Sequence, residues 1–516
     1  AQETGRMSIS AEIDPAAFRE SDLLAFQIAI EKGQPGSVMC AYNRIGGIYA
    51  CEHPELLTRI LKEDWAYPGW VMSDWGAVHS LSSASAGLDQ ESGQEMDAQV
   101  FFGAPLKSAV LNGQIFAVKV RDMARRILRS MFANGLFDDP VRAGTLDLAT
   151  DGAVARTAAE QGIVLLKNQG GLLPLSPAVR RVAVIGNHAD FGVLSGGGSS
   201  QVIPRGSLRL PAEPGAESWI AGVIYHPSSP LAAIRLRAPE VAYNDGRDLV
   251  AAAALARQAD VAIVFAGQWT TEGSDAALSL SGNQDDLIAA VAQANPKTIV
   301  VLETGGPVIM PWLGQAGAVI EAWYPGAQGG EAIARVLYGE VNPSGRLPVT
   351  FPASTFQLPN PGLPNGPVAS YPEGSDVGYR GYAGSGLTPL FPFGRGLSYT
   401  SFRYGPLTLS GGDVLKASFT VTNTGSREGI DTPQVYLVSG AARRQQRLVG
   451  WSKVSLKPGE TRQVTVTADP RLLANWDDGA RRWRIEAGAY RVALGTDAAS
   501  LSAPVTAQLK ARTFAP

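Results

Sequence analysis

Apolar residues in the first 140 positions alternate between short continuous runs and runs with helical spacing. The helical runs are residues 11–33, Pro54–Trp65 and Phe116–Ala133, where apolar side chains recur every three or four positions. Between them, Ser37–Tyr42 and Trp70–Met72 are continuous, as buried strands are. Strand, helix, strand is the repeating unit of a parallel barrel, so residues 1–138 predict part of a (β/α)8-type barrel.

A second alternating region, residues 158–352, contains longer β-rich runs. Val182–Gly186, Val261–Gly267 and Ile299–Leu302 are apolar throughout, and helical segments such as Leu249–Ala259 fall between them. Continuous apolar strands are typical of a parallel sheet that is buried on both faces. We therefore expect an α/β sandwich domain with a mostly parallel sheet.

Residues 396–516 change to strict alternation of apolar and polar positions. Leu415–Thr422, Gln434–Val438 and Gln463–Thr467 alternate in this way, and turn residues separate them. Several short strands at such spacing predict an antiparallel β-sandwich.

Two connecting stretches have no sustained period. Residues 139–157 read as a linker. Residues 353–395 are rich in Pro and Gly and too long for a tight connection, which leaves a functional loop or an interdomain wrap. Because a complete barrel needs about 250 residues, we also expect an N-terminal barrel segment, in the same precursor or as a separate chain.

Composition narrows the class of protein. With 516 residues, 45% apolar and 18% charged, the chain has the make-up of a multidomain globular protein. A net charge of −3 gives no reason to expect nucleic acid or an anionic membrane as partner. No apolar run approaches the length that spans a bilayer, about 18 residues.

The sequence gives no signal for a metal or a cofactor. The histidines lack paired ligand spacing, and the run Val182–Gly186 has one of the three glycines that a dinucleotide fingerprint needs. Two cysteines, Cys40 and Cys51, bracket one loop, either as a disulfide in an exported enzyme or as free buried thiols. The histidines are His53, His79, His188 and His226.

Asp74 is the candidate for chemistry. It follows the run Trp70–Met72 in Ser-Asp-Trp-Gly, which places its carboxylate at a strand tip. In parallel α/β folds that end of the strand faces the substrate crevice, and the aromatic Trp75 beside it suits a sugar. The alternative is a helix N-cap or turn residue.

A long resemblance supports the first interpretation. VMCAYNRIGGIYACEHPELLTRILKEDWAYPGWVMSDWGA (38–77) resembles the nucleophile region of glycoside hydrolase family 3, the β-glucosidase family. The last domain is similar to the fibronectin type III-like domain of many members. Further matches follow in the family's order: AAEQGIVLLKNQGGLLPL (158–175), GGGSS (196–200), WTTEGSD (269–275), NPSGRLPVTFP (342–352) and FPFGRGLSYTSF (391–402).

The resemblance implies a pair of catalytic carboxyls. Asp74 matches the nucleophile and Glu272 the acid/base of a retaining mechanism, in which the two carboxyls lie about 5 to 5.5 Å apart. Since they belong to different domains, we expect the site at a domain interface. A dry setting for Glu272 would raise its pKa and suit an acid. Without the resemblance, Glu272 would read as a solvated loop residue.

The same resemblance implies substrate contacts. Met39 and Tyr42 match residues that line the terminal sugar site, with Tyr42 able to hydrogen-bond to the nucleophile; otherwise they are core residues of a strand. Trp75 matches an aromatic plate and Ser199 a serine that contacts substrate. Arg6 is a further candidate.

Together these features predict an exo-acting, retaining β-D-glucosidase without cofactor. Its substrates would be short oligosaccharides or aryl and plant glucosides, and family habit implies a secreted or periplasmic enzyme, possible as a homodimer. Trp75 after the nucleophile favours glucosidase over β-xylosidase. The alternatives are a β-xylosidase or other glycosidase of the family, and a non-catalytic carbohydrate-binding fragment.

Overall fold

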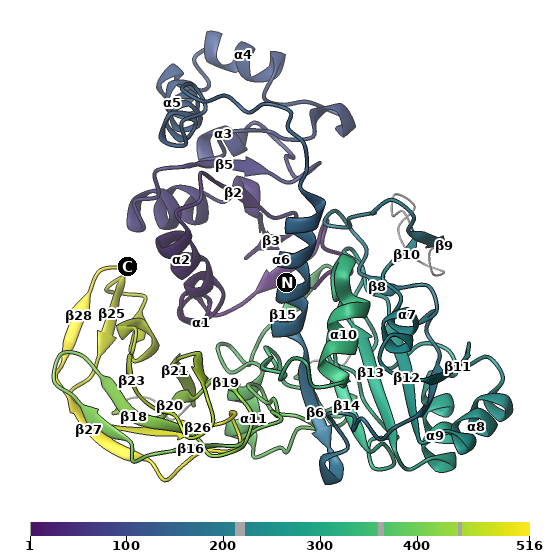
Figure 1. Ribbon diagram of the computed structural model, residues 1–516. Coiled ribbons are helices and arrows are strands. Elements are labelled where there is room, and N and C mark those ends of the chain that lie inside the picture. The colour runs from purple at the N-terminus through teal and green to yellow at the C-terminus, as the bar shows by residue number, and fades with distance from the viewer. Residues whose placement is uncertain (1, 212–221, 360–365, 442–445) are drawn as a thin grey trace.

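The computed structural model describes residues 2–211, 222–359, 366–441 and 446–516. Figure 1 shows an N-terminal lobe (residues 2–138) at the top, an α/β lobe (158–352) at the lower right and a C-terminal lobe (396–516) at the lower left. The helix α6 (Leu148–Gly162) runs down the centre from the first lobe to the second.

The N-terminal lobe is built around two parallel strands. β2 (Ser37–Cys40) pairs with β5 (Trp70–Ser73), with Met39 opposite Met72. Val71 is fully buried, and η2 (Glu55–Asp64, a π-helix) contributes Leu57 and Leu61 to the core around the pair. A smaller core joins α3 (Ser82–Ala86), α4 (Ala104–Leu111) and α5 (Ala117–Ala133).

The single helix expected over residues 11–33 is wrong. The structure has a strand, β1 (Ser10–Glu12), and two helices, α1 (Pro15–Glu20) and α2 (Asp22–Gly33). Asp14 caps α1 by accepting from the Ala17 N–H at 2.9 Å. The backbone leaves the helix at Ser21, with φ −118° and ψ −82°, and both the Ser21 N–H and the Ser21 hydroxyl donate to the Ala17 carbonyl, at 3.0 and 2.7 Å.

The α/β lobe carries a six-stranded sheet in the order β11-β7-β12-β13-β14-β6, parallel except where β6 joins. Alternate residues of each strand face two separate cores, one covered by α7 and α10 and the other by α8 and α9. The strands are β6 (Val164–Asn168), β7 (Arg181–Ile185), β11 (Glu240–Asn244), β12 (Val261–Gln268), β13 (Thr298–Thr304) and β14 (Ala318–Glu321). The helices are α7 (Pro230–Arg235), α8 (Leu249–Gln258), α9 (Gln284–Ala294) and α10 (Gly329–Leu337). A small antiparallel sheet beside them contains β8 (Val193–Ser195), β9 (Leu208–Leu210) and β10 (Val223–His226).

The two connecting stretches are more ordered than their composition indicates. Residues 148–157, expected as irregular linker, form the first part of α6, because Asp147 caps the helix by accepting from the Thr150 N–H. In the stretch 353–395, β15 (Val368–Ser370) pairs in parallel with β1, and α11 (Tyr379–Ser385) follows. This stretch therefore wraps back onto the N-terminal lobe; its residues 360–365 lie outside the described part.

The C-terminal lobe consists of antiparallel strands around a core that includes Phe419, Trp483 and Tyr490. One sheet contains β16 (Phe402–Tyr404), β17 (Thr408–Ser410), β18 (Lys416–Asn423) and β23 (Thr461–Thr467). Another contains β20 (Gln434–Ser439), β21 (Arg447–Trp451), β26 (Gly488–Gly495) and β27 (Val505–Leu509). Smaller sheets pair β19 (Gly429–Asp431) with β22 (Val454–Leu456), and join β24 (Asn475–Asp477), β25 (Arg482–Ile485) and β28 (Arg512–Phe514).

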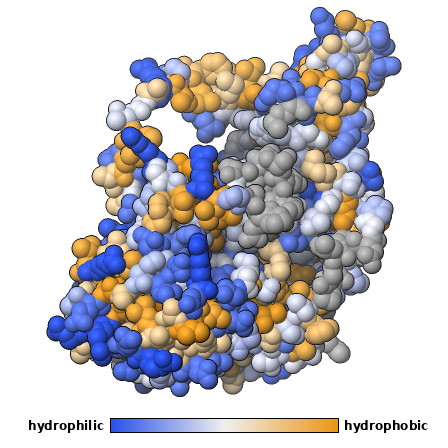
Figure 2. Space-filling model, turned by 90° about the vertical axis from the view of Figure 1, so that its right-hand side faces the viewer, coloured by the Kyte–Doolittle hydropathy of each residue, from blue (hydrophilic) through white to orange (hydrophobic). Residues whose placement is uncertain are grey.

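Apolar side chains are exposed at the top of the molecule. Leu111, Phe116 and Phe132, on or beside α4 and α5, are largely exposed, and Figure 2 shows hydrophobic surface in that uppermost part. Within the described ranges, no helix combines the length and apolar character needed to cross a membrane.

Candidate active site

Asp74 lies directly after β5, at the carboxyl end of the β2 and β5 pair. Its N–H donates to the Cys40 carbonyl at 3.3 Å, which holds the residue against the end of β2. One carboxylate oxygen, Oδ1, accepts from the Trp75 N–H at 2.8 Å. The expected strand-tip position is therefore what the structure has.

A buried ion pair supports β5 from behind. Asp89 accepts from the Val71 N–H at 2.8 Å and from Lys62 Nζ at 2.7 Å, and the two side chains are only 2% and 8% exposed. Burial raises the pKa of the Asp89 carboxyl and lowers the pKa of Lys62, while each partner opposes the shift of the other. The pair holds the strand that presents Asp74.

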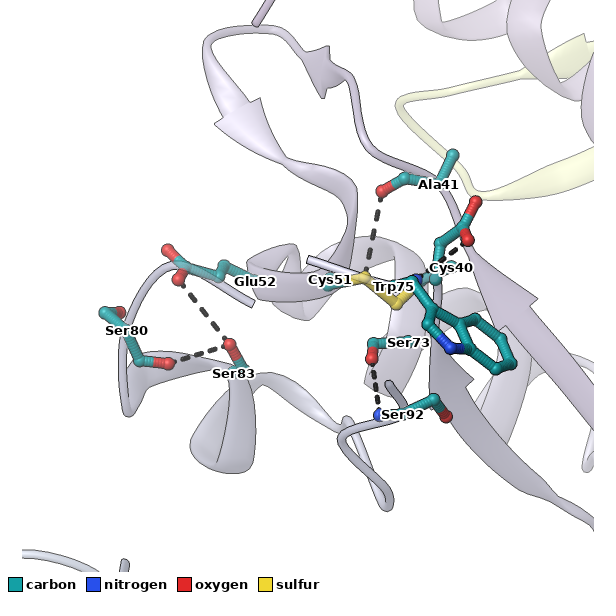
Figure 3. The surroundings of a disulfide bond; sticks show 10 residues. Cys40, Ala41, Cys51, Glu52, Ser73, Trp75, Ser80, Ser83 and Ser92 are labelled. Carbon is teal, nitrogen blue, oxygen red and sulfur yellow. Dashed lines mark hydrogen bonds between the residues drawn. A yellow bond between two sulfur atoms is a disulfide. The ribbon is translucent and has the colours of Figure 1, made fainter. Parts of the chain in front are cut away.

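Cys40 and Cys51 form a disulfide, with their Cα atoms 5.2 Å apart, which resolves the alternative left open by the sequence. Its surroundings include Ala41 and Ser73, at the ends of β2 and β5 (Figure 3). The bond closes a loop that carries Tyr42, so it restrains a residue that reaches Asp74.

The Tyr42 phenol lies close enough to Asp74 for that carboxylate to act on its pKa, and the resemblance implies that the two side chains interact. Burial raises the pKa of Tyr42, and the nearby Asp74 carboxylate raises it further. Tyr42 therefore keeps its proton and donates it toward the carboxylate.

Trp75 is 42% exposed and packs on Gly93. Gly93 has φ +71°, and a Cβ at this position would lie 2.7 Å from the indole Nε1. Only glycine fits at position 93, so Gly93 allows the indole ring of Trp75 to occupy its observed position.

Glu272 follows β12 in the α/β lobe, and two donors hold its carboxylate. Oε2 accepts from the Ser199 N–H at 2.7 Å, and Oε1 accepts from Arg6 Nη2 at 2.9 Å. A Cβ on Gly198 would lie 2.8 Å from Oε2, so the Gly-rich loop approaches Glu272 closely because it has no side chain there. Ser199, expected as a substrate contact, holds Glu272 in this structure.

The prediction that the pKa of Glu272 is raised is wrong for this arrangement. Burial does raise it, but the Ser199 N–H and the Arg6 guanidinium outweigh burial and leave the pKa of the Glu272 carboxyl below its usual value. The causes are first the Ser199 N–H and then the cation of Arg6 from the other lobe, and spacing along the chain reveals neither. This arrangement favours the carboxylate form.

Arg6 joins the two candidate carboxyls. Its guanidinium pairs with Glu272 and lies 5.1 Å from the ring centroid of Tyr42, which contacts Asp74. The charge of Glu272 also contributes to raising the pKa of Tyr42, so both carboxyls act on one phenol. Asp74 and Glu272 thus flank one Arg6 and Tyr42 pair between the two lobes.

Sequence analysis missed the contacts that bring the lobes together. The backbone N–H groups of Glu3 and Thr4 donate to the Asp275 carboxylate at 3.2 and 3.1 Å. Glu3 Oε2 in turn accepts from the Gly273 N–H at 2.8 Å. These partners are about 270 positions apart, so no local pattern could predict them.

Met39 is 49% exposed on β2 and is not a core residue. It lines a largely apolar cavity of about 650 Å3 between α2, β2 and the stretch that contains Tyr371. Within the described part of the chain, no group of His, Cys, Asp and Glu residues has the arrangement of a metal site.

Family models match most of the chain. Residues 2–129 match the glycosyl hydrolase family 3 N terminal domain, residues 163–399 the family 3 C-terminal domain and residues 431–498 the fibronectin type III-like domain.

Curated relatives and solved structures agree with these models. The chain is 35% identical to thermostable beta-glucosidase B of Acetivibrio thermocellus, over 96% of this chain and 66% of the relative. It is 31% identical to a beta-glucosidase of Rhizobium radiobacter, over 98% and 81%, and 34% identical to an exo-alpha-(1->6)-L-arabinopyranosidase of Bifidobacterium breve, over 99% and 68%. A beta-glucosidase of Streptomyces venezuelae in complex with D-glucose has a TM-score of 0.88 at 32% identity, covering 98% of this chain and 80% of that one.

Proposed function

This chain belongs to glycosyl hydrolase family 3, a family of glycoside hydrolases, and we propose that it is an exo-acting, retaining β-D-glucosidase. The observation that carries the proposal is the meeting of Asp74 and Glu272, from two lobes, at one Arg6 and Tyr42 pair. The beta-glucosidase names of the relatives support glucose as the sugar. Short oligosaccharides and aryl or plant glucosides are the substrates that we expect.

In the first step, the Asp74 carboxylate attacks the anomeric carbon and forms a covalent glycosyl ester. Tyr42 orients this carboxylate through its hydroxyl, and because the hydroxyl stays neutral it adds no competing charge. Glu272 donates a proton to the leaving oxygen as the glycosidic bond breaks. Trp75 offers an indole face to the leaving group.

In the second step, the Glu272 carboxylate takes a proton from water, and the resulting hydroxide displaces Asp74 from the sugar. Arg6 and Ser199 favour the charged form of Glu272 that this step needs. We expect the bound glycoside to weaken the Arg6 contact in the first step, which would let the pKa of Glu272 rise.

The same proposal covers the domain architecture and location. We assign residues 1–138 to part of a (β/α)8-type barrel, 158–352 to an α/β sandwich and 396–516 to a fibronectin type III-like sandwich, joined by 139–157 and 353–395. The disulfide supports export to an oxidising compartment, since such bonds persist there.

A second candidate is exo-α-L-arabinopyranosidase activity, which the 34% identical relative favours by its name. A panel of nitrophenyl β-D-glucoside, β-D-xyloside and α-L-arabinopyranoside decides between them. We expect the highest kcat/KM on the glucoside. Faster turnover of either pentoside would replace the assignment, and sugar binding without turnover would favour the non-catalytic interpretation.

The catalytic roles are tested with Asp74→Asn and Glu272→Ala, and with Glu240→Gln as a control at an exposed glutamate of the α/β lobe. Asp74→Asn should abolish turnover, while Glu272→Ala should regain activity with azide on substrates with good leaving groups and give the retained glycosyl azide. Failure of azide to restore activity or form this product would assign the acid to another residue.

A further inference from the structure

A second cavity, of about 610 Å3, lies at the carboxyl edge of the α/β sheet, apart from Asp74 and Glu272. The loops after β7, β11 and β12 form it. The chain leaves β7 for β11 on one side of the sheet and reaches β12 on the other, which makes this edge a topological switch point. Open α/β sheets bind ligands at such points.

The wall of this cavity is rigid and strained. Gly186, Asn187 and His188, which follow β7, have φ of +88°, +37° and +53°. Left-handed backbone is strained at a non-glycine residue, and such strain clusters at functional sites. The Asn187 amide keeps this conformation, since it accepts from the Tyr225 hydroxyl at 2.7 Å and donates to the fully buried Glu303 at 3.0 Å.

An unused donor lies beside this wall. Trp269 lines the cavity, and its buried indole N–H finds no acceptor in the described part of the chain. A buried indole N–H normally has a hydrogen-bond partner. Because the nitrogen itself is buried, a ligand hydroxyl would reach it only after a shift of the indole ring.

The remaining lining indicates the ligand chemistry. Asp190 accepts from the Tyr243 hydroxyl at 2.8 Å, and Asp245 lies 3.4 Å from the exposed Arg247 guanidinium. Two carboxylates and one guanidinium disfavour an anionic ligand such as a phosphate. Carboxylates accept from hydroxyl groups, and the rings of Trp269 and Tyr243 can pack on the C–H face of a sugar.

We propose that this cavity is a second saccharide-binding site, separate from the hydrolytic site. Its volume is that of a small-molecule pocket, about 300 to 1,000 Å3. The choice of saccharide rests on the proposed function, because a chain that hydrolyses glycosides meets the same compounds in both sites. The geometry of the cavity does not depend on hydrolysis.

The test measures binding of cellobiose and cellotetraose by calorimetry to the full chain with Asp74→Asn. We expect two classes of sites. Adding Asp190→Ala and Asp245→Ala, both at exposed positions, should weaken one class at least tenfold, and in the otherwise wild-type chain leave kcat/KM on nitrophenyl glucoside within twofold. Glu240→Gln serves as the matched surface control.

Each outcome of these measurements either supports or overturns the proposed second site. A single class of sites that the double substitution leaves unchanged would overturn the proposal, as would binding of inorganic phosphate in the cavity without binding of either saccharide. If the wild-type chain hydrolyses no glycoside but the Asp190- and Asp245-dependent class remains, the proposed function fails and the second site stands.

Discussion

The buried pair of Lys62 and Asp89 carries the most direct prediction about the strand that presents Asp74. Lys62→Met removes the cation but leaves the Asp89 carboxylate, which is 2% exposed, without its ion-pair partner. Breaking a buried pair from one side costs about 3 to 5 kcal/mol. The lost Lys62 contact to the Gly87 carbonyl, now 2.7 Å, acts in the same direction.

Hydrogen exchange of β5 measures this cost without relying on any activity. Because Asp89 also accepts from the Val71 N–H, opening of the pair exposes the amide of that strand. We expect exchange in the peptide that covers β5 to accelerate roughly a hundredfold to several thousandfold, since about 1.4 kcal/mol corresponds to a factor of ten. The acceleration should be smaller at about pH 5 than at about pH 7, because a protonated Asp89 needs no cation.

Arg125→Met is the matched control. Arg125 pairs with Asp122 in the same lobe at 2.7 Å, but its side chain is 76% exposed. Such a surface pair contributes about 0 to 1 kcal/mol. If both substitutions change β5 exchange equally, or if Lys62→Met leaves it unchanged, the buried pair does not hold this strand.

Three further predictions concern the disulfide, a buried carboxyl and the acid/base. Replacing Cys40 and Cys51 by Ala should cost about 3 kcal/mol by urea denaturation, the loop-closure entropy for cysteines 11 positions apart; no loss would contradict this. Burial raises the pKa of Glu303 to about 8, so stability falls as pH rises from the unfolded value of about 4.3 toward 8, since the unfolded state releases its proton first. In the same urea assay, the free energy of unfolding of Glu303→Gln relative to wild type should rise by on the order of 1 kcal/mol per pH unit across that range. A difference that stays constant with pH would show that Glu303 is not protonated in the folded protein. Arg6→Gln should raise the pKa of Glu272 and move the basic limb of the kcat/KM profile to higher pH, whereas an unmoved limb would show that Arg6 does not control the acid.

The strands of the α/β lobe could be predicted because a strand that is buried on both faces is apolar along most of its length, which is visible in the sequence. Every residue of β12 is buried, and so is every residue of β13, and each contains an unbroken apolar run, Val261–Gly267 in β12 and Ile299–Leu302 in β13. Asp74 could be placed for a similar reason, since a polar residue that ends such a run lies at the strand tip.

Features that depend on single hydrogen bonds or distant partners could not be predicted. At the break at Ser21, within an otherwise helical pattern, the hydroxyl adds a second hydrogen bond to the Ala17 carbonyl beside that of the backbone N–H. The lowered pKa of Glu272 comes from the Ser199 N–H and from Arg6, which are 73 and 266 positions away. In both cases the pattern of apolar residues is the same with or without the feature, so this pattern could not predict it.

The distance between the two carboxyls is therefore a property of how the lobes dock. Asp74 is positioned by β5 and Glu272 by a loop of the α/β lobe, and neither element fixes the other. The N-terminal strand β1 pairs with β3 (Arg44–Ile45) of its own lobe and with β15, while the residues before it bind the Glu272 loop through Asp275 and Gly273. One short segment thus ties both lobes at the site, and loosening it should separate the carboxyls while each lobe keeps its fold.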